Sequence, residues 1–539
     1  MSRITFEDQL DFGIPEDYER LAMPGPSRDA SGRLVLPVST LEELAERAFS
    51  DIAFKLPLEQ AAAFGAVARD QAASEADRFV AAELLRNAVI AAEGLLPLCQ
   101  DTGTAIVYGW KGSGFATVGA DPGGDAAALA RGTARAYAGH LLRNSQLAPL
   151  GFMDEVNTGD NLPLVADLRA VAGDEYRFCF SAKGGGSANR TSLSMESPAL
   201  LDAAALEARL RERIGSLGAS ACPPYRISLV LGGQSPEEAL HALSLTSLGL
   251  LDRLGTVTEG NGGALRDPEW EARMLAIARS TRVGAQFGGS ALALAARAIR
   301  LPRHAASLPL AMGVACAAHR RARALVTEDG VFLERLEADP ARFLPQELPA
   351  LPGARHVDLD RPQAELAREL GSLEPGSFLL LSGTVVTARD AAHARFRVLV
   401  EGGKPLPDYL SRHGVFYAGP TEAAPGQASG SFGPTTGGRM DSYMEMLVSR
   451  GASLVSIAKG GRSPEAARAI GGGGGVYLAC VGGAAALAAR ENVLSSEIID
   501  YPELGMEAVR RVVLRDLPAM LVVDGHGRDF YALAKQGGR

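Results

Sequence analysis

Apolar positions recur with the period of a helix through residues 39–96. This pattern predicts amphipathic helices whose apolar face meets a core, and Pro57 divides the segment because proline cannot continue a helix interior. The apolar positions that share the first helical face are Leu41, Leu44, Ala45, Ala48 and Phe49. We therefore expect helices on both sides of Pro57, and a further helix over residues 126–142.

Short apolar runs bounded by turn residues predict strands in the next part of the chain. Residues 104–108 form one run, and residues 164–171 and 175–181 form two more around Gly173-Asp174. Two runs joined by such a short turn are typical of a hairpin. We therefore expect the second and third runs to pair with each other.

The apolar run at residues 227–231 predicts a buried strand, and the residues after it predict the start of a helix. Ser235 is suited to cap the helix, Pro236 to occupy its first position, and Glu238 to complete a capping box. Residues 320–336 carry turn residues near their middle and predict a hairpin.

Strands and helices alternate in the last third of the chain, which is typical of an α/β fold. The expected strands are residues 378–386, 454–457 and 519–523, and the expected helices are residues 439–449 and 464–469. A chain of 539 residues exceeds the size of one hydrophobic core. A Pro- and Leu-rich passage at residues 343–353 suggests where the domains join. The expected division is an extension (1–38), a first domain (39–342), a linker (343–360) and a second domain (361–539).

The charge balance argues mildly against nucleic acids and anionic membranes as partners and carries no information about a small anionic substrate. There are 54 Lys and Arg against 63 Asp and Glu, a net charge of -9, whereas nucleic acids and anionic membranes favour basic surfaces. The acidic N-terminus argues against a targeting signal. The uncharged run at residues 469–489 is mostly Gly and Ala, so we interpret it as a buried strand, loop and helix. We expect a cytoplasmic protein with no nucleic acid or membrane partner.

The chain has five cysteines and no CxxC pair, which disfavours a disulfide framework and a zinc ribbon. Scattered cysteines are often simply buried. Three of them nevertheless stand in distinctive surroundings: Cys99 precedes Gln100-Asp101 at a turn, Cys222 precedes two prolines, and Cys316 ends an apolar run. Together these three could bind three irons of a cubane cluster and leave the fourth as a Lewis acid.

Two glycine-rich segments with cationic side chains are candidate anion sites. Residues 183–190 offer backbone N–H groups beside Lys183 and Arg190, and residues 433–440 place Arg439 at an expected helix start. The alternative for each segment is a tight structural turn. His304 lies in an expected loop, where a histidine is more often a surface residue than a catalyst.

In these segments the sequence resembles the class I fumarases. The resemblance extends in order from about residue 39 to 530 and includes both expected domains. The matching segments are residues 98–104, 183–189, 221–225, 284–289 and 301–304 in the first domain, and 382–384, 389–390, 419–421, 430–440 and 501–507 in the second.

The resemblance implies an α/β protein with an N-terminal mixed α/β domain that binds a [4Fe-4S] cluster and a C-terminal α/β domain of the swivelling type. It implies Cys99, Cys222 and Cys316 as cluster ligands, whereas Cys179 and Cys480 match no ligand. It assigns acid/base work to Asp101 and Thr435, with His304 in support. The substrate-binding positions that it implies are Gln100, Arg143, Gly186, Asn189, Arg190, Arg389, Thr436, Arg439 and Lys459. Arg190 departs from the lysine of the family.

The implied activity is the reversible hydration of fumarate to (S)-malate by a homodimer. Arginine binds carboxylates bidentately, so the cations suit a small dicarboxylate despite the acidic whole. A related hydroxy acid, such as tartrate or citramalate, is the nearest alternative substrate. From another class, a non-catalytic iron or redox sensor would retain the cysteines without needing the acid, base and cation set.

Overall fold

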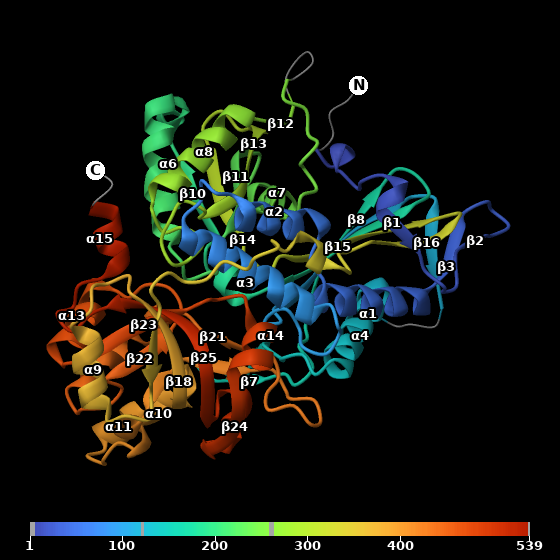
Figure 1. Ribbon diagram of the computed structural model, residues 1–539. Helices are drawn as coiled ribbons and strands as arrows, with labels where there is room; N and C mark the ends of the chain where they lie inside the picture. The colour runs from blue at the N-terminus through green and yellow to red at the C-terminus, as the bar shows by residue number, and fades with distance from the viewer. Residues whose placement is uncertain (1–5, 120–122, 258–262, 537–539) are drawn as a thin grey trace.

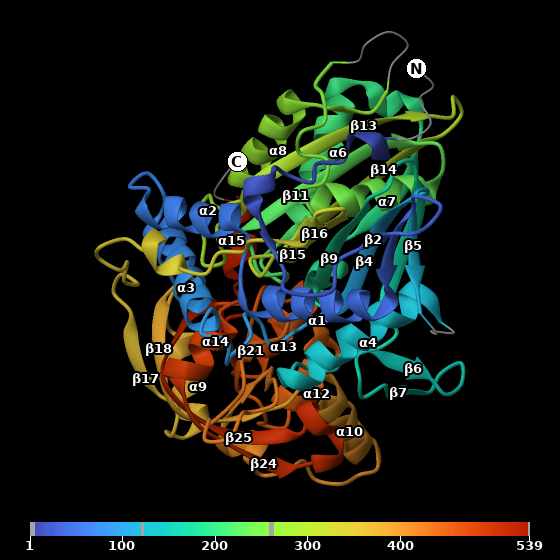
Figure 2. The ribbon, with the colours of Figure 1, turned by 90° about the vertical axis from the view of Figure 1, so that its right-hand side faces the viewer.

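The computed structural model describes residues 6–119, 123–257 and 263–536. Figures 1 and 2 show two parts: the N-terminal helices and strands, blue to yellow, lie above the orange-to-red C-terminal part. The expected mixed α/β class is confirmed. No helix in the described ranges combines the length and the apolar character that a membrane crossing requires.

Three helices open the N-terminal part: α1 (Val38–Phe54), α2 (Leu58–Arg69) and α3 (Glu75–Ala91). The break expected at Pro57 is confirmed, since this residue stands at the N-cap of α2. The face of α1 that the sequence marked as apolar is buried. Helix α4 (Gly124–Gly139) packs closely on α1, because a Cβ at Gly132 would lie 2.1 Å from the backbone oxygen of Glu42.

A six-stranded sheet contains the first strands that the sequence predicted. Its strands, in spatial order, are β1 (Tyr18–Arg20), β16 (Gly330–Glu334), β15 (Arg320–Thr327), β9 (Tyr176–Lys183), β4 (Thr104–Gly112) and β8 (Val165–Val171). The hairpin of β15 and β16 is confirmed.

The expected pairing of β8 with β9 is wrong. Strand β4 lies between them, parallel to β8 and antiparallel to β9. The turn at Gly173 binds the end of β4 instead, since Gly114 N donates to Gly173 O at 2.8 Å. Almost every residue of β9 is buried, as in a strand with a neighbour on each side, and β15 is the second neighbour. Apolar runs predict strands but carry no information on this insertion.

A five-stranded sheet forms the rest of the N-terminal part. Its order is β10 (Ser192–Glu196), β14 (Leu308–Ala315), β11 (Tyr225–Gly233), β13 (Ala293–Arg303) and β12 (Leu265–Arg266). Helices α6 (Ala203–Leu217) and α8 (Pro268–Ser280) share one core with one sheet face. Helix α7 (Pro236–Ser247) shares another core with the opposite face and with the six-stranded sheet. Ser235 caps α7 as expected, accepting from Glu238 N.

The C-terminal part is built on a seven-stranded sheet. Its order is β17 (Arg355–Asp358), β18 (Phe378–Thr387), β19 (Gly414–Phe416), β22 (Val455–Ala458), β23 (Val476–Cys480), β25 (Val509–Val523) and β24 (Val493–Asp500). Because β25 also pairs with β18, five of these strands close into a ring. The strands and helices expected here are confirmed, including the buried strand, loop and helix of residues 469–489.

Helices and short strands complete the architecture. The C-terminal helices are α9 (Gln363–Gly371), α10 (Asp390–Glu401), α11 (Tyr409–Arg412), α12 (Met444–Val448), α13 (Pro464–Gly472), α14 (Ala485–Leu487) and α15 (Phe530–Gln536), and α5 (Gly185–Ala188) belongs to the N-terminal part. The remaining strands are β2 (Ser27–Arg28), β3 (Leu34–Pro37), β5 (Phe115–Val118), β6 (Leu147–Pro149), β7 (Glu155–Asn157), β20 (Ala418–Pro420) and β21 (Phe432–Pro434).

The segments at both expected boundaries join the neighbouring sheets. From residues 1–38, β1 pairs with β16 and β3 pairs with β5. From residues 343–360, β17 pairs with β18. One hydrophobic core runs through both parts of the molecule. The division into domains at these particular residues stays a prediction.

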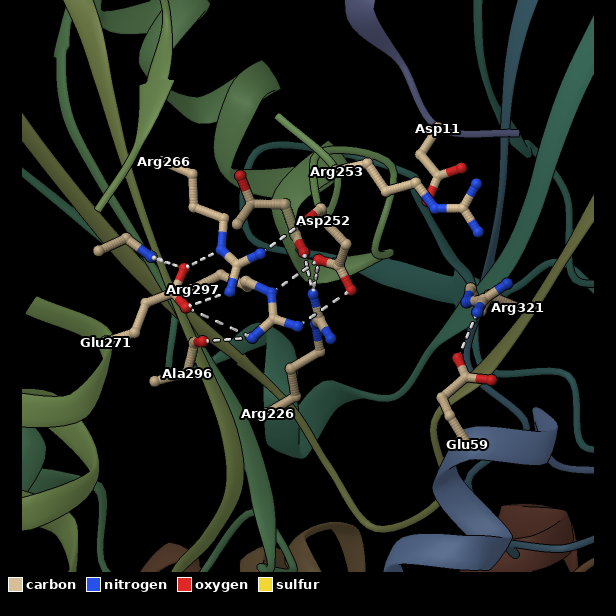
Figure 3. A network of polar contacts seen from close by, with 12 residues as sticks. Asp11, Glu59, Arg226, Asp252, Arg253, Arg266, Glu271, Ala296, Arg297 and Arg321 are labelled. Carbon is tan, nitrogen blue, oxygen red and sulfur yellow. Dashed lines mark hydrogen bonds and ion pairs between the residues drawn. The ribbon is translucent and has the colours of Figure 1, made fainter. Parts of the chain in front are cut away.

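A network of mostly half-buried charges connects strands and loops of the five-stranded sheet (Figure 3). Arg226 and Arg297 both bind Asp252, the latter at 3.0 Å, and Arg266 binds Glu271 at 2.7 Å. Each of these arginines has a carboxylate partner within the network. Arginine in this protein is therefore not by itself a sign of a binding site.

Candidate active site

A cavity of about 1240 Å³ lies between the N-terminal and C-terminal parts. Its lining draws on the two parts together. The sequence-predicted residues in this lining are Gln100, Asp101, Arg143, Gly186, Asn189, Arg389, Thr435, Thr436, Arg439 and Lys459. Segments that are far apart in the chain thus meet at one polar cavity.

The segment around Cys99 connects α3 to β4 and is anchored to both parts. Asn87 Nδ2 donates to Leu98 O at 2.9 Å, and Gln100 Nε2 donates across the boundary to Pro434 O at 3.1 Å. Gly103 has a φ of +85°, and a Cβ there would lie 2.8 Å from the backbone of Lys183. The turn that the sequence predicted after Cys99 therefore needs glycine.

Cys222 and Cys316 lie next to each other in space, because Ala317 N donates to Cys222 O at 2.9 Å. Burial raises the pKa of Cys99, Cys222 and Cys316, and each thiol is close enough to another to affect its charge. Gly482, from the C-terminal part, closes this cluster: a Cβ there would lie 2.6 Å from Cys222 Sγ.

Two buried cations accompany the thiols. Lys459 Nζ donates to Cys222 Sγ at 2.8 Å. Burial acts to lower the pKa of Lys459, but the thiols of Cys222, Cys99 and Cys316 together outweigh it and the pKa is raised. Arg320, only 3% exposed, favours the charged form of Cys99 and Cys316. Thiolates gathered at this point would therefore meet compensating positive charge.

The donor set fits an iron–sulfur cluster better than a single metal ion. In the described ranges, no three His, Cys, Asp or Glu side chains converge on a point that could hold one ion. In a cubane, each cysteine binds a different iron, so the thiols need not share one ion's coordination distances. Three soft thiols without a fourth ligand, with buried cations beside them, suit a cluster with one open iron.

Cys179 and Cys480 lie elsewhere in buried positions. Cys179 is in β9, where burial raises its pKa to about 12, and Cys480 is in β23. Both belong to hydrophobic cores.

The two residues with expected acid/base roles approach the cavity from opposite parts. Asp101 Oδ2 accepts from Gly185 N at 2.8 Å, so the glycine-rich segment after β9 holds this carboxylate. Thr435 Oγ1 accepts from Arg439 Nη1 at 3.3 Å. The neighbouring Thr436 Oγ1 donates to Ser220 O at 3.1 Å, which ties the second glycine-rich segment to the loop of Cys222.

Cations of the cavity are partly neutralised by carboxylates. Arg439 forms a two-pronged ion pair with Asp390, with contacts of 2.9 and 2.8 Å. Glu507 Oε1 lies 3.1 Å from Arg389 and 3.5 Å from Arg143. Burial, and then the nearby charge of Arg143, lower the pKa of Arg389 to about 10. The arginines thus repel one another and are only partly neutralised by Glu507 and Asp390. A further carboxylate would reduce this repulsion.

Of the residues with expected acid/base or substrate-binding roles, two do not line this cavity, and the three candidate cysteine ligands also lie outside its lining. His304 is exposed in the loop between β13 and β14, where its Nδ1 accepts from Ala306 N. Arg190 follows α5, and its charge acts to lower the pKa of Tyr225, against the larger effect of burial, which raises it. Within one chain, the structure does not bring either side chain into the lining.

Sequence reasoning missed several residues of the site. Glu507 lies in a segment that the family resemblance had marked, but without a role. Arg320 lies in a strand and Gly482 in a Gly- and Ala-rich run, and neither has a neighbouring motif. Their roles depend on contacts between distant segments, for which a single sequence carries no signal.

The fold and site define a two-domain α/β protein with a cation-lined cavity between the domains and a group of three thiols beside it. Residues 42–325 match the family described as Fumarate hydratase (Fumerase), and residues 330–534 match the family described as Fumarase C-terminus.

Two fumarate hydratases are similar to this chain over almost its full length. "Fumarate hydratase class I, aerobic" of Escherichia coli (strain K12) is 44% identical over 539 residues, 98% of each chain. "Fumarate hydratase 2" of Leishmania major is 44% identical over 93% of this chain and 88% of the relative. "L(+)-tartrate dehydratase subunit beta" of Escherichia coli (strain K12) is 32% identical, over only 32% of this chain. The chain belongs to the class I fumarate hydratase family.

Proposed function

We propose that this protein catalyses the reversible hydration of fumarate to (S)-malate with a [4Fe-4S] cluster. The observation that carries the proposal is the cavity lined by Arg143, Arg389 and Arg439. The thiols of Cys99, Cys222 and Cys316 lie beside it and are connected to it through Lys459, a lining residue that donates to Cys222 Sγ. Full-length similarity to proteins named fumarate hydratase supports this substrate. Similarity to the tartrate dehydratase subunit covers a third of the chain, so it supports tartrate less well.

Cys99, Cys222 and Cys316 would hold the cluster. When bound, it would supply a Lewis-acidic iron that makes the substrate hydroxyl a better leaving group. Lys459 and Arg320 would balance the charge of the thiolates, since both are buried beside them. Gly482 leaves space at Cys222 that any side chain would fill.

The arginines would bind and orient the dicarboxylate. Arg143 and Arg389 approach from different parts of the molecule, so a substrate carboxylate bound to both is fixed relative to the thiols. Arg439 would hold the other carboxylate. The proton removed from malate is weakly acidic, and these cations stabilise the charge that develops on the neighbouring carboxylate.

Asp101 and Thr435 would move the proton. Asp101 is held by Gly185 N and so keeps a fixed direction. A threonine hydroxyl has an unsuitable intrinsic pKa, and a neighbouring cation makes its ionised form easier to reach. Arg439 is such a neighbour, with Nη1 at 3.3 Å from Thr435 Oγ1.

We further propose a cytoplasmic homodimer. His304 and Arg190 do not line the cavity of their own chain, so a supporting role for them at the substrate would require a second copy. Mixing an inactive Asp101→Asn variant with an inactive Arg439→Ala variant tests whether two chains share a site. Recovered activity would indicate sharing.

The function is tested with anaerobically reconstituted protein. Absorbance of fumarate, mesaconate and oxaloacetate reports the products of malate, citramalate and tartrate. We expect turnover of malate and fumarate above the others, loss of activity in air, and recovery with ferrous iron and thiol. A protein that takes up iron but turns over none of these substrates would instead support a sensor.

A further inference from the structure

A short segment after β24 closes one side of the cavity and has no role in the mechanism above. This segment, Pro502–Glu507, is a turn of 3-10 helix (η7). Tyr501 enters it with a left-handed backbone, at φ +49°, and Gly505 breaks its regular geometry at φ +58°. Glu507 follows this break and directs its carboxylate to the arginines of the cavity.

The Glu507 carboxylate joins three groups from two parts of the molecule. Its Oε1 lies 3.1 Å from Arg389 Nη2 and 3.5 Å from Arg143 Nη2, and its Oε2 accepts from Ala391 N at 3.2 Å. Arg143 belongs to the N-terminal part, whereas Arg389 and Ala391 surround the start of α10. The Glu507 side chain is 22% exposed, so these contacts are partly shielded from water.

We propose that Glu507 is a positioning residue that holds Arg143 and Arg389 together in the geometry that receives one substrate carboxylate. This inference rests on the proposed function and adds to it a residue that need not contact the substrate.

The charges around Glu507 explain why such a group is needed. Arg389 is nine-tenths or more buried and lies near the charges of both Arg143 and Arg439, which disfavour its protonated form. Glu507 acts in the opposite direction, as does Asp390. Without Glu507, three guanidinium groups would face one remaining carboxylate, and their mutual repulsion would favour moving apart.

Arg143 and Arg389 line the cavity while Glu507 holds them. Their Nε atoms are closed off from solvent, so a ligand would approach the outer nitrogens of each guanidinium group. Glu507 occupies only an Nη2 atom of each arginine. A substrate carboxylate can therefore bind these guanidinium groups while Glu507 stays in place.

The alternative is that Glu507 occupies the site as an internal competitor that the substrate must displace. The two possibilities predict opposite effects. Loss of the carboxylate weakens substrate binding if Glu507 positions the arginines, but strengthens binding if Glu507 competes.

The experiment compares the anaerobic wild-type holoenzyme with Glu507→Gln, Glu507→Asp and Glu497→Gln. Glu497, in β24, is a matched control, because its exposed carboxylate lies 3.6 Å from Arg511 in the neighbouring strand β25. Three quantities are measured: kcat and KM for malate, the Kd of succinate as an inert four-carbon dicarboxylate, and iron and sulfide content.

We expect Glu507→Gln to raise KM and the succinate Kd about 10- to 100-fold, because an ion-paired hydrogen bond to a buried cation is lost. The kcat should change less than KM, and iron and sulfide content should match the wild type. Glu507→Asp keeps the charge on a shorter arm, so its loss of affinity should be smaller, about 3- to 10-fold. Glu497→Gln should behave as the wild type.

A succinate Kd and KM within twofold of the wild type in Glu507→Gln, or lower than the wild type, would overturn the proposal. So would loss of affinity that only parallels loss of iron, since that marks a structural role. If Glu507→Gln does not fold, Glu507→Asp decides, and unchanged affinity there overturns the proposal. Wild-type protein that binds succinate but does not turn over malate or fumarate would refute the proposed function, while the succinate comparison still tests Glu507.

Discussion

At the scale of single residues, Cys99, Cys222 and Cys316 differ from the other cysteines in what surrounds them. Each has a second thiol nearby, whereas Arg321, Glu334 and Arg323 are the charged groups that act on Cys179, and burial alone raises the pKa of Cys480. A thiol in an apolar core resists ionisation and is a poor metal ligand. The surroundings therefore separate the three candidate ligands from the two structural cysteines.

Serine at any of the three candidate ligands should remove most cluster absorbance and abolish activity, because a hydroxyl is a poor ligand for iron in a cluster. Cys179→Ser and Cys480→Ser are the matched controls and should keep their iron. Iron analysis and visible absorbance of anaerobic protein measure the effect. Full cluster content in Cys222→Ser would remove that residue from the ligand set.

His393 provides a residue-scale prediction about pH. Burial lowers the pKa of His393 to about 4, and its Nδ1 lies 2.9 Å from Arg389 O. In the unfolded chain a histidine takes up a proton near pH 6.5. Because the folded pKa is the lower one, the unfolded state binds more protons between these values, and stability falls as pH falls from about 6.5 to 4.

The maximum loss from this one group is about 3 kcal/mol. His393→Phe removes the titrating group and should make the urea midpoint less sensitive to pH between 7 and 5 than in the wild type. The Phe variant is also expected to be less stable at pH 7, since it loses the bond to Arg389 O. Equal acid sensitivity in both proteins would show that other groups dominate.

At the scale of elements, periodicity predicted α1, α2, α3 and several strands of each part, because each of these elements buries one face in a core. It did not predict strand order. The insertion of β4 between β8 and β9 depends on which edges are free when the sheet assembles. Hydrogen-bonding groups of the backbone are the same in every strand, so the sequence specifies pairing only weakly.

The loop between β23 and α14 yields an element-scale prediction. A Cβ at Gly482 would lie 2.6 Å from Cys222 Sγ and 2.7 Å from Lys459 Cδ, both in a packed region. Gly482→Ala should therefore displace Cys222 and lower iron content severalfold, with activity falling in parallel. Gly472→Ala, at the end of α13, is the control, because a Cβ there meets nothing within 4 Å. Normal iron content in Gly482→Ala would mean that the loop can shift without cost.

At the scale of the whole molecule, the two parts form one packed body with a polar seam. Gln286 is the main bridge near the thiols: its Nε2 donates to Pro223 O and to Gly482 O, both at 2.9 Å, and its Oε1 accepts from Gly482 N at 2.7 Å. It thus connects the loop of Cys222 to the loop that covers it from the C-terminal part.

Gln286→Ala should leave buried backbone groups of both loops without partners, at a cost of about 1–3 kcal/mol for each. We expect a fall of several degrees in Tm and weaker retention of iron on dilution into chelator. Gln71→Ala, at an exposed position, should change neither. An unaltered Tm in Gln286→Ala would show that water replaces the lost bonds.

The residues of the candidate site fall into two groups: those that stand in sequence motifs and those that act only through contacts with remote segments. Gln100, Asp101, Thr435 and Arg439 stand in motifs, and their placement around one cavity was expected from the family resemblance. Glu507, Arg320 and Gln286 act only through segments that are remote in the sequence. His304 and Arg190 were expected at the site and lie outside the cavity of their own chain.

The sequence by itself determined many of the helices and strands and where α7 begins, since periodicity, capping and turn chemistry act over a few residues. It also showed which thiols were candidates, and the family resemblance supplied most of the candidate cations. Only the tertiary structure decided the order of β8, β4 and β9, the closure of the C-terminal sheet, and the meeting of Lys459 with Cys222. These depend on burial and electrostatics between segments far apart in the chain. Such interactions exist only once the whole core has formed.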